Sequence, residues 1–513
     1  MSEQIRIRLI TKEGGNEAEL FHDRNRTLLH TLREGGISLP SLCDALGKCG
    51  RCLVRFCGYA PLPTPSDRAL LRPEQLRNGY RLACMARPVK DCKVETAFAE
   101  ERRMDILTAS STVDRPARGG ECKKNGGRKD IKADAIADIG TTTIAMQMVE
   151  AGSGCILDTF TCLNPQRIYG MDVISRIRAG MEGNGEVLQK LVRNALEDGI
   201  RKMVKNVEDG GVCRLECIFL SANTVMGHLF MGYPVETLGK SPFMPMHIKR
   251  DGLDWLGAPA VLVPGISAFV GGDIVSGLYA CGLCGHQGNG KWLFLDLGTN
   301  AEMVMGNGDR IAATAAAAGP AFEGRGGEGI AGAERISAIA ALLDQGIVDE
   351  TGLMADPYFE TGIERIIKRE GRTGIKVKIC QEDIRDIQMA KAAIRAGIHF
   401  LMEHLAVEGY EEIERVYIAG GFGFYLDKKA AARIGLIPYE WAEKAKTVGN
   451  TSLAGVRLLE RERVKQGGGN ILEWDVWDDL ERFAGKAEVF QLAEEPGFDK
   501  VYVDFMNFDV WQY

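Results

Sequence analysis

Two related segments, Asp138-Ile139-Gly140-Thr141-Thr142-Thr143 and Asp296-Leu297-Gly298-Thr299-Asn300, decide how most of this 513-residue chain folds. Each follows an apolar run that predicts a strand, and both contain the pattern D-[IL]-G-T. The pattern places a carboxylate at a strand end and then a glycine-led hairpin, whose backbone N–H groups and Thr hydroxyls can wrap phosphate oxygens. One such segment is a weak signal, but two in duplicated positions, each after a strand, are a much stronger one.

A third glycine-rich element follows the predicted strand at 415–419. Glycines there allow a flat nucleobase or ribose to approach the backbone. The chain has neither G-x-x-x-x-G-K-[ST] nor a strand-placed G-x-G-x-x-G, so a P-loop or dinucleotide-binding reading is weak. An ordinary α/β enzyme with glycine-rich turns is the alternative. The sequence predicts a nucleotide-binding set made of Gly140, Thr141, Thr142, Thr143, Gly298, Thr299, Asn300, Gly420 and Gly421.

Three carboxylates are the candidate catalytic residues. Asp138 and Asp296 stand at the ends of the two strands, where paired carboxylates can hold Mg²⁺ largely through water. Glu302 lies further along the second hairpin and can orient a water molecule. Phosphoryl transfer at such a site proceeds mainly by positioning and charge neutralisation.

Four cysteines near the N-terminus form a candidate metal centre. Cys43, Cys49 and Cys52 have the spacing C-x5-C-x2-C, and Cys84 follows much later. An iron–sulfur cluster needs four converging thiolates, three of which a tight loop can supply. Zinc is the alternative, but zinc favours paired CxxC knuckles or added histidines, and no histidine lies near these cysteines. The nearby Cys57 and Cys92 are expected in the core.

The rest of the chain predicts the domain organisation. Residues 1–99 read as a small α+β unit, 100–131 as a polar flexible tether, and 132–513 as a long α/β region. Within the last, 383–405 is a predicted helix with Asp383 as N-cap. No apolar run reaches the roughly 18 residues of a membrane span, and the N-terminus has no secretory signal. A cytoplasmic protein is expected, whose cysteines are thiols or metal ligands rather than disulfides. No basic cluster interleaved with aromatics points to nucleic acid.

The three glycine-rich elements, in this order, resemble the phosphate-1, phosphate-2 and adenosine motifs of the actin, sugar kinase and heat-shock ATPase superfamily. That resemblance implies a two-lobed, actin-like (ASKHA, ribonuclease H-like) α/β domain that binds ATP and Mg²⁺, with interdomain helices at 265–278 and 424–436. The cysteine loop, with Tyr80-Arg81-Leu82-Ala83-Cys84, resembles adrenodoxin-like ferredoxins. It implies an α+β (β-grasp) domain with a [2Fe–2S] cluster.

The combination of ferredoxin, tether and ATPase resembles the reductive activators of corrinoid-dependent methyltransferases. Further segments carry the resemblance: Asn164-Pro165-Gln166, Tyr169 to Arg176, Asn223 to His228, Ala318 to Gly324, Arg385 to Ala392, and Gly449-Asn450-Thr451-Ser452. It implies that the cluster donates one electron to a Co(II) corrinoid protein, giving Co(I), and that ATP hydrolysis drives this uphill step. It also implies an upstream low-potential electron donor and a homodimer formed through the ATPase domain.

One departure from that family is expected. Its members carry an extra small domain between ferredoxin and ATPase, where this chain has only the tether. Three other functions remain as alternatives. One is an activator of acyl-CoA reductases or dehydratases, although those use a [4Fe–4S] cluster shared across a dimer. The second is a nucleotide-responsive redox sensor, and the third a small-molecule kinase, which would need no ferredoxin.

Overall fold

The computed structural model describes most of the chain. The described residues are 5–10, 18–35, 37, 39, 45–48, 50, 52–96, 108–110, 130–208, 212–285, 290–298, 300–319, 332–369, 372–465 and 469–508. By their internal contacts the residues form two compact units. The first comprises 1–104, 163–195 and 229–241, and the second comprises 105–162, 196–228 and 242–513.

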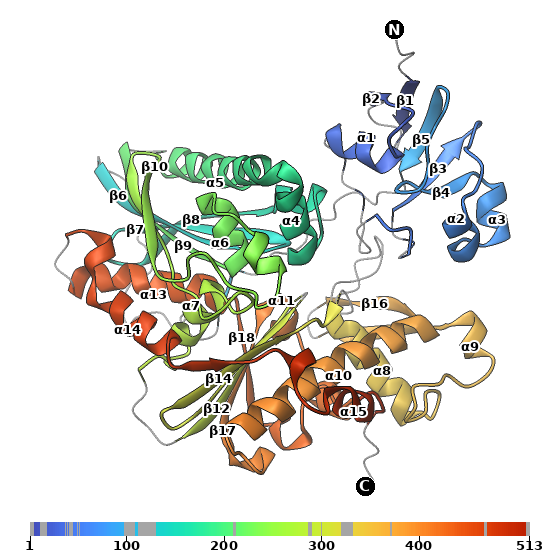
Figure 1. Ribbon diagram of the computed structural model, residues 1–513. Helices are drawn as coiled ribbons and strands as arrows, with labels where there is room; N and C mark the ends of the chain where they lie inside the picture. Colours follow the sequence, from blue (N-terminus) through green and yellow to red (C-terminus); the bar gives the residue numbers. More distant parts are fainter. Residues whose placement is uncertain are drawn as a thin grey trace. The chain divides into compact units, whose positions relative to one another are not determined.

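The N-terminal part of the first unit is a five-stranded sheet with short helices (Figure 1). The strand order is β2-β1-β5-β3-β4, and only β1 and β5 run parallel. Alternate side chains of β1 are buried, and they pack with Leu28, Leu29 and Leu32 of α1. This is the predicted β-grasp arrangement. Its elements are β1 (Ile5–Ile10), β2 (Ala18–His22), α1 (Leu28–Glu34), β3 (Leu53–Cys57), α2 (Pro65–Leu70), α3 (Pro73–Arg77), β4 (Tyr80–Leu82) and β5 (Cys92–Thr96).

Two further sheets repeat one topology. One has the order β10-β11-β9-β6-β7-β8 and the other β18-β17-β12-β13-β14-β19. In each, the first strand pairs antiparallel with the next strand and parallel with a later one, which pairs parallel with a further strand. The edge strands differ, because β10 is antiparallel to β11 and β19 is parallel to β14. The repeat confirms two lobes of related topology. The strands are β6 (Asp130–Ile139), β7 (Thr143–Glu150), β8 (Cys155–Leu163), β9 (Val212–Ala222), β10 (Asp251–Trp255), β11 (Ala258–Leu262), β12 (Lys291–Leu297), β13 (Ala301–Asn307), β14 (Arg310–Ala316), β17 (Ile413–Ala419), β18 (Ala445–Gly449) and β19 (Ala487–Val489).

Helices and a small ribbon complete the described fold. The ribbon pairs β15 (Ile363–Arg369) with β16 (Arg372–Ile379). The α-helices are α4 (Val173–Ala179), α5 (Gly185–Val207), α6 (Thr224–Met231), α7 (Gly272–Ala280), α8 (Gly332–Asp344), α9 (Tyr358–Thr361), α10 (Gln381–His404), α11 (Gly420–Phe424), α12 (Lys428–Arg433), α13 (Thr451–Lys465), α14 (Asp475–Ala484) and α15 (Phe498–Asp504). The short turns are η1 (Pro165–Ile168), η2 (Gly180–Asn184), η3 (Glu236–Gly239), η5 (Tyr410–Glu412), η6 (Tyr439–Trp441), η7 (Ile471–Glu473) and η8 (Leu492–Glu494).

Helices α7 and α13 join the two lobes by crossing at close range. A side chain at Gly455 of α13 would overlap the backbone of Ser276 in α7, so the glycine permits the crossing. Helix α7 is apolar on two faces. Val275 packs with residues of β6, β9 and α13, whereas Ile274 and Leu278 pack with residues of β12 and β13. One helix therefore contributes to the cores of both lobes.

Several boundaries differ from the prediction. The first interdomain helix begins at Gly272, not at residue 265. The second was expected at 424–436, but that range holds the short α12, which packs on α8, while α13 makes the crossing. The N-cap of α10 is Cys380, because the Asp383 carboxylate accepts the Cys380 N–H at 3.0 Å from inside the first turn. Strand β6 begins at Asp130, two residues inside the segment predicted as tether, because Asp130 and the next residue pair with β9.

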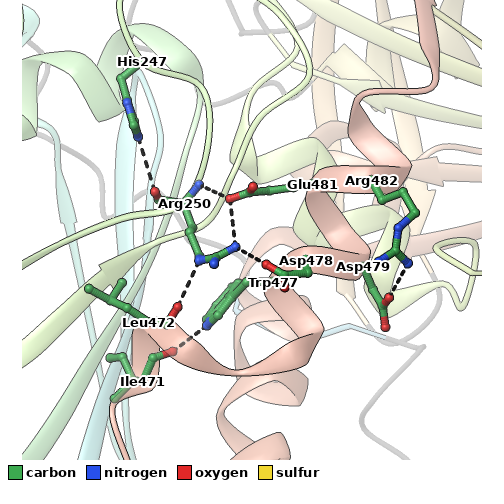
Figure 2. Close-up of polar contacts among 9 residues, drawn as sticks. All are labelled: His247, Arg250, Ile471, Leu472, Trp477, Asp478, Asp479, Glu481 and Arg482. Carbon is green, nitrogen blue, oxygen red and sulfur yellow. Dashed lines mark hydrogen bonds and ion pairs between the residues drawn. The ribbon is translucent and has the colours of Figure 1, made fainter.

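The C-terminal segment contacts both lobes. Arg250, just before β10, donates its backbone N–H to Glu481 at 3.0 Å and its side chain to Asp478 and to the Leu472 carbonyl, at 2.7 and 2.9 Å (Figure 2). Trp477 of α14 is fully buried against this lobe. The chain then forms β19, which pairs with β14 of the other lobe. Among the described residues, no helix combines the length and the apolar character that crossing a membrane requires.

Candidate functional site

The first hairpin puts Asp138 at the end of β6. Gly140 begins the turn and donates its N–H to the carbonyl of Thr143, where β7 begins, at 2.9 Å. A Cβ atom on Gly140 would lie 2.7 Å from that carbonyl oxygen, so this tight turn requires glycine. Thr141 accepts a hydrogen bond from the Asn223 amide at 2.9 Å, which fixes its hydroxyl. Thr142 completes the turn.

The second hairpin places Asp296 and Glu302 face to face. Asp296 lies near the end of β12, and Glu302 is its direct partner on β13. Gly298 donates its N–H to the Asn300 carbonyl at 2.9 Å and so closes the turn. The remaining predicted residue of this turn, Thr299, lies outside the described residues.

The third element lies against the second hairpin. Strand β17 pairs with β12, so that Ala419 is opposite Asp296. Gly420 follows with a φ of +87°, and a Cβ atom there would lie 2.7 Å from an Asp296 carboxylate oxygen. No atom lies within 4 Å of the place where Gly421 would carry a Cβ atom. Gly420 therefore leaves room for the carboxylate, and Gly421 leaves an open approach to the backbone.

Asp138 is held from the start of α13. The Asn450 amide donates to one of its carboxylate oxygens at 3.0 Å, and the Ser452 hydroxyl donates to the other at 2.8 Å. Ser452 is also 3.0 Å from the Ser221 hydroxyl, which in turn is 2.9 Å from that of Ser276. These hydroxyls connect β6, β9, α7 and α13 beneath the carboxylate.

A fourth carboxyl group belongs to this site. Asp273, in the first turn of α7, was not predicted as a site residue. Burial, then the charges of Asp296 and Asp138, raise its pKa to about 8. Burial and the Asp138 charge raise the pKa of Asp296 to about 7. The same causes, with Asp273 and Asp296 as neighbours, raise the pKa of Glu302 well above its ordinary value. Burial raises that of Asp138 as well, against the opposing hydrogen bonds from Ser452 and Asn450.

These raised pKa values indicate a site with surplus negative charge. Each of the four carboxyl groups keeps part of its surface accessible although protein surrounds it closely. A divalent cation would relieve their mutual repulsion. In the part of the chain that the structure describes, no three His, Cys, Asp or Glu side chains converge closely enough to ligate a metal directly. The arrangement therefore fits a Mg²⁺ ion held mainly through water, as Mg²⁺ often is.

Sequence reasoning missed the residues that complete the site. Asn450 and Ser452 were noted only for their resemblance to a family, and they lie 312 and 314 residues from Asp138. Asp273 gave one signal, a carboxylate directly after two glycines at a helix start. Asn223 gave another, since it precedes α6 and its side chain accepts the Met226 N–H at 2.9 Å as a cap.

The structure brings two of the four predicted metal ligands together. The Cys84 N–H points to the Cys52 sulfur at 3.5 Å, and both thiols are buried. Hydrogen bonding from the Cys84 side chain lowers the pKa of Cys52 to about 7, against the effect of burial. Two adjacent buried thiols, one of them easily ionised, fit the ligand set of an iron–sulfur cluster. Cys43 and Cys49 lie outside the described residues.

Cys92 behaves as a core residue. It is buried on β5, and burial raises the pKa of its thiol to about 12. A thiol that resists ionisation is a poor metal ligand. The expectation that Cys92 packs in the core is therefore confirmed.

Three family models match successive parts of the chain. Residues 10–89 match a 2Fe–2S iron–sulfur cluster binding domain. Residues 135–286 match the RACo middle region. Residues 291–328 and 325–512 match the C-terminal domain of RACo, the ASKHA domain. These matches confirm the predicted [2Fe–2S] ferredoxin domain and the predicted ASKHA fold. The middle-region match falls on the residues predicted as the first part of the ATPase, after the tether.

Curated relatives point the same way. The chain is 28% identical over 393 residues to the corrinoid activation enzyme RamQ of Eubacterium limosum, covering 65% of each chain. It is 29% identical over 266 residues to the [Co(II) methylated amine-specific corrinoid protein] reductase of Methanosarcina barkeri, covering 41% of this chain and 45% of that one. The alignments thus span less than two thirds of either relative.

A solved structure extends the likeness along the whole chain. It is a reductive activator for corrinoid, iron–sulfur protein, 26% identical, with a TM-score of 0.63 and 98% of both chains covered. The chain belongs to the family of reductive activators of corrinoid proteins.

Proposed function

We propose that this protein reduces an inactive Co(II) corrinoid protein to Co(I) in a one-electron step that depends on ATP, and so reactivates a methyltransferase system. One observation carries the proposal: a single chain joins a ferredoxin domain with paired buried thiols to an ASKHA domain with four interacting carboxyl groups. The names of its relatives, an activation enzyme and a Co(II) corrinoid reductase, support the choice of acceptor.

The proposed cluster ligands are Cys43, Cys49, Cys52 and Cys84. When bound, the [2Fe–2S] cluster supplies the single electron. The chain itself excludes water from Cys52 and Cys84 and directs the Cys84 N–H to sulfur. Such N–H groups stabilise negative charge at the sulfurs and tune the potential.

The nucleotide site has proposed roles for each predicted residue. Phosphate oxygens would be bound by the two hairpins, through Gly140, Thr141, Thr142, Thr143, Gly298, Thr299 and Asn300. The adenosine part would lie along Gly420 and Gly421, where the backbone is open. Asp138 and Asp296 would hold the water shell of Mg²⁺, and Glu302 would orient the attacking water.

ATP is needed because the electron moves uphill. Plant-type clusters have potentials near about −400 mV. Each further 59 mV disfavours a one-electron transfer by about tenfold. Nucleotide binding and hydrolysis offset this only if they stabilise the reduced cobalt state or its complex over the oxidised one. The electron that converts Co(II) to Co(I) would come from the reduced cluster that these cysteines would hold, while ATP and water would give ADP and phosphate.

Several partners and boundaries are part of the proposal. The corrinoid protein is the acceptor, an upstream low-potential protein reduces the cluster, and residues 130–513 form a homodimer. The proposed domain division is 1–99 for the ferredoxin, 100–129 for the tether and 130–513 for the ATPase, with the last boundary moved to the start of β6. The tether lets the ferredoxin domain exchange between donor and acceptor.

The test is direct. Anaerobically reduced protein is added with Mg-ATP to a Co(II) corrinoid methyl carrier, and the optical band of Co(I) is followed. We expect the band with ATP, and far less of it with ADP or without nucleotide. No Co(I) with any carrier, or the same yield without ATP, would overturn the proposal.

A further inference from the structure

A short stretch of the predicted tether is bound to the edge of the ATPase domain. Residues 108–110, here called the strap, lie along the end of β18. Ala109 accepts the Asn450 N–H at 3.0 Å, and the Ser110 hydroxyl donates to the Val448 carbonyl at 2.8 Å. Ser110 forms an antiparallel bridge with Gly449 and is only 2% exposed. The strap therefore extends the edge of the sheet with both backbone and side-chain contacts.

Gly449 leaves the space that the strap occupies. Its φ is +79°, and a Cβ atom there would overlap the Ala109 carbonyl oxygen and lie 3.1 Å from the Phe424 ring. Any other residue would displace the strap or strain the backbone. The end of β18 is thus shaped to receive the strap.

Asn450 connects the strap to the nucleotide site. Its backbone N–H binds the strap, and its side-chain amide binds the Asp138 carboxylate at 3.0 Å. Its side-chain oxygen accepts the Leu453 N–H at 2.8 Å and so caps α13. The side chain cannot turn over without losing both contacts, so the position of the strap and the position of Asp138 depend on one residue.

We propose that the strap is a positioning element of the nucleotide site, and that strap docking and Mg-nucleotide binding favour each other through Asn450. The inference rests on the proposed function, since it takes the twin hairpins as the nucleotide site. A docked strap holds Asn450 ready to orient Asp138. Linkage makes the effect reciprocal: if docking strengthens nucleotide binding by some factor, the nucleotide strengthens docking by the same factor.

Docking also sets how far the ferredoxin domain can reach. With the strap docked, residues 97–107 connect β5 to the anchor. Without it, residues 97–129 connect β5 to β6, about three times as many. The maximum spans are about 40 Å and about 110 Å. The effective concentration of the ferredoxin domain near its anchor falls by about fivefold when a linker triples in length. Nucleotide binding would thereby shorten the linker between the ferredoxin domain and the ATPase domain.

The test compares two glycine substitutions in the full-length protein with its cluster. Gly449→Ala drives a methyl group into the strap. Gly257→Ala is the matched control, because Gly257 also has a φ of +79° and no atom within 4 Å of its Cβ position. Both variants carry the same backbone strain, so only the first disturbs docking. Ser110→Ala and the conservative Ser110→Thr, with Ser153→Ala as an exposed control, form a second set.

Two readouts are measured. Calorimetry with a Mg²⁺ complex of a non-hydrolysable ATP analogue gives the affinity, which we expect to fall about tenfold in Gly449→Ala and to stay within twofold of the native value in Gly257→Ala. Hydrogen exchange of the 445–453 peptide reports the Asn450 N–H. We expect the analogue to slow this exchange in the native protein and in Ser110→Thr, but not in Gly449→Ala.

The outcomes separate this inference from the proposed function. The coupling between the strap and the nucleotide is overturned if Gly449→Ala and Gly257→Ala bind the analogue equally well. It is also overturned if exchange at Asn450 in the native protein does not depend on nucleotide. Neither result affects the proposed ATP-dependent reduction. Native protein that binds no adenine nucleotide overturns both.

Discussion

The two D-[IL]-G-T hairpins occupy equivalent positions in the two lobes, yet their carboxylates have different surroundings. Asp138 accepts hydrogen bonds from Asn450 and Ser452. Among the described residues, no hydrogen-bond donor binds the Asp296 carboxylate. Instead Gly420, which has no side chain, leaves room beside one of its oxygens. The two hairpins therefore share a carboxylate followed by a glycine-led turn, but they differ in the length of the turn and in what holds the acid. We infer that Asp138 ties the site to α13 and the strap, whereas Asp296 stays available for a hydrated cation.

The largest expected effect comes from Asp296→Asn. The change keeps the shape but removes the charge that the cation needs, so we expect ATP turnover to fall by at least about a hundredfold, the range seen when one preorganised electrostatic group is lost. Turnover is measured by phosphate release, with the cluster spectrum as the control for folding. A turnover rate within threefold of the native one would contradict the assignment of Asp296 to the cation.

The same variant should be more stable without nucleotide at high pH. The folded-state pKa of Asp296 is about 7, above the ordinary value for Asp, so the folded state holds a proton that the unfolded state loses. Native stability therefore falls as pH rises from about 4 towards 7, and Asp296→Asn escapes this loss. Thermal unfolding at pH 8 should show a higher midpoint for the variant, and at pH 4 no difference.

Glu302→Gln should have the next largest effect. Glu302 faces Asp296 across the hairpin, and its proposed role is to orient water rather than to bind nucleotide. We expect turnover to fall by about ten- to a hundredfold with nucleotide affinity nearly unchanged. A variant that loses affinity and keeps turnover would assign Glu302 to binding instead.

A double-mutant cycle between Ser452→Ala and each aspartate sharpens the comparison. Ser452 donates to Asp138 at 2.8 Å, so the pair Ser452→Ala and Asp138→Ala should show a coupling of about 1–2 kcal/mol in the free energy of unfolding. The pair Ser452→Ala and Asp296→Ala should be additive within about 0.5 kcal/mol. Equal coupling in both cycles would mean that Ser452 does not distinguish the hairpins.

The smallest effect is expected far from both hairpins, at His404. Although burial opposes its charge, hydrogen bonds to Glu488 and Glu495 raise the pKa of His404 above its ordinary value. The contribution of protonated His404 to the free energy of unfolding is complete below its unfolded-state pKa. It is lost as pH rises through its folded-state pKa. His404→Gln should therefore destabilise the protein more at pH 5.5 than at pH 8.5 and leave ATP turnover unchanged. A reversed pH trend in denaturant titrations would contradict the ion pairing.

The sequence predicted the parts of this site that are local in the chain. Each hairpin is a strand, a carboxylate and a glycine turn in succession, and its pattern is visible without the fold. The partners of Asp138 come from a helix start more than three hundred residues away, and no local pattern reports such a contact. The prediction of two lobes succeeded because the two hairpins and the third glycine-rich element are local motifs whose order resembles that of a known superfamily.

The errors also have physical causes. Asp383 was taken as an N-cap because of its residue type, while the backbone begins α10 at Gln381 and uses the carboxylate from inside the helix. The second interdomain helix was placed too early, because two short helices, α11 and α12, follow the glycine-rich element before α13 begins.

One measurement tests the central claim most directly: nucleotide affinity and ATP turnover in Asp138→Asn and Asp296→Asn, side by side. In Asp138→Asn a neutral amide replaces the carboxylate that accepts hydrogen bonds from Asn450 and Ser452, so the charged anchor of the site loop is lost. We predict weakened affinity in Asp138→Asn, and near-native affinity with lost turnover in Asp296→Asn. The same loss of affinity and turnover in both variants would contradict the account.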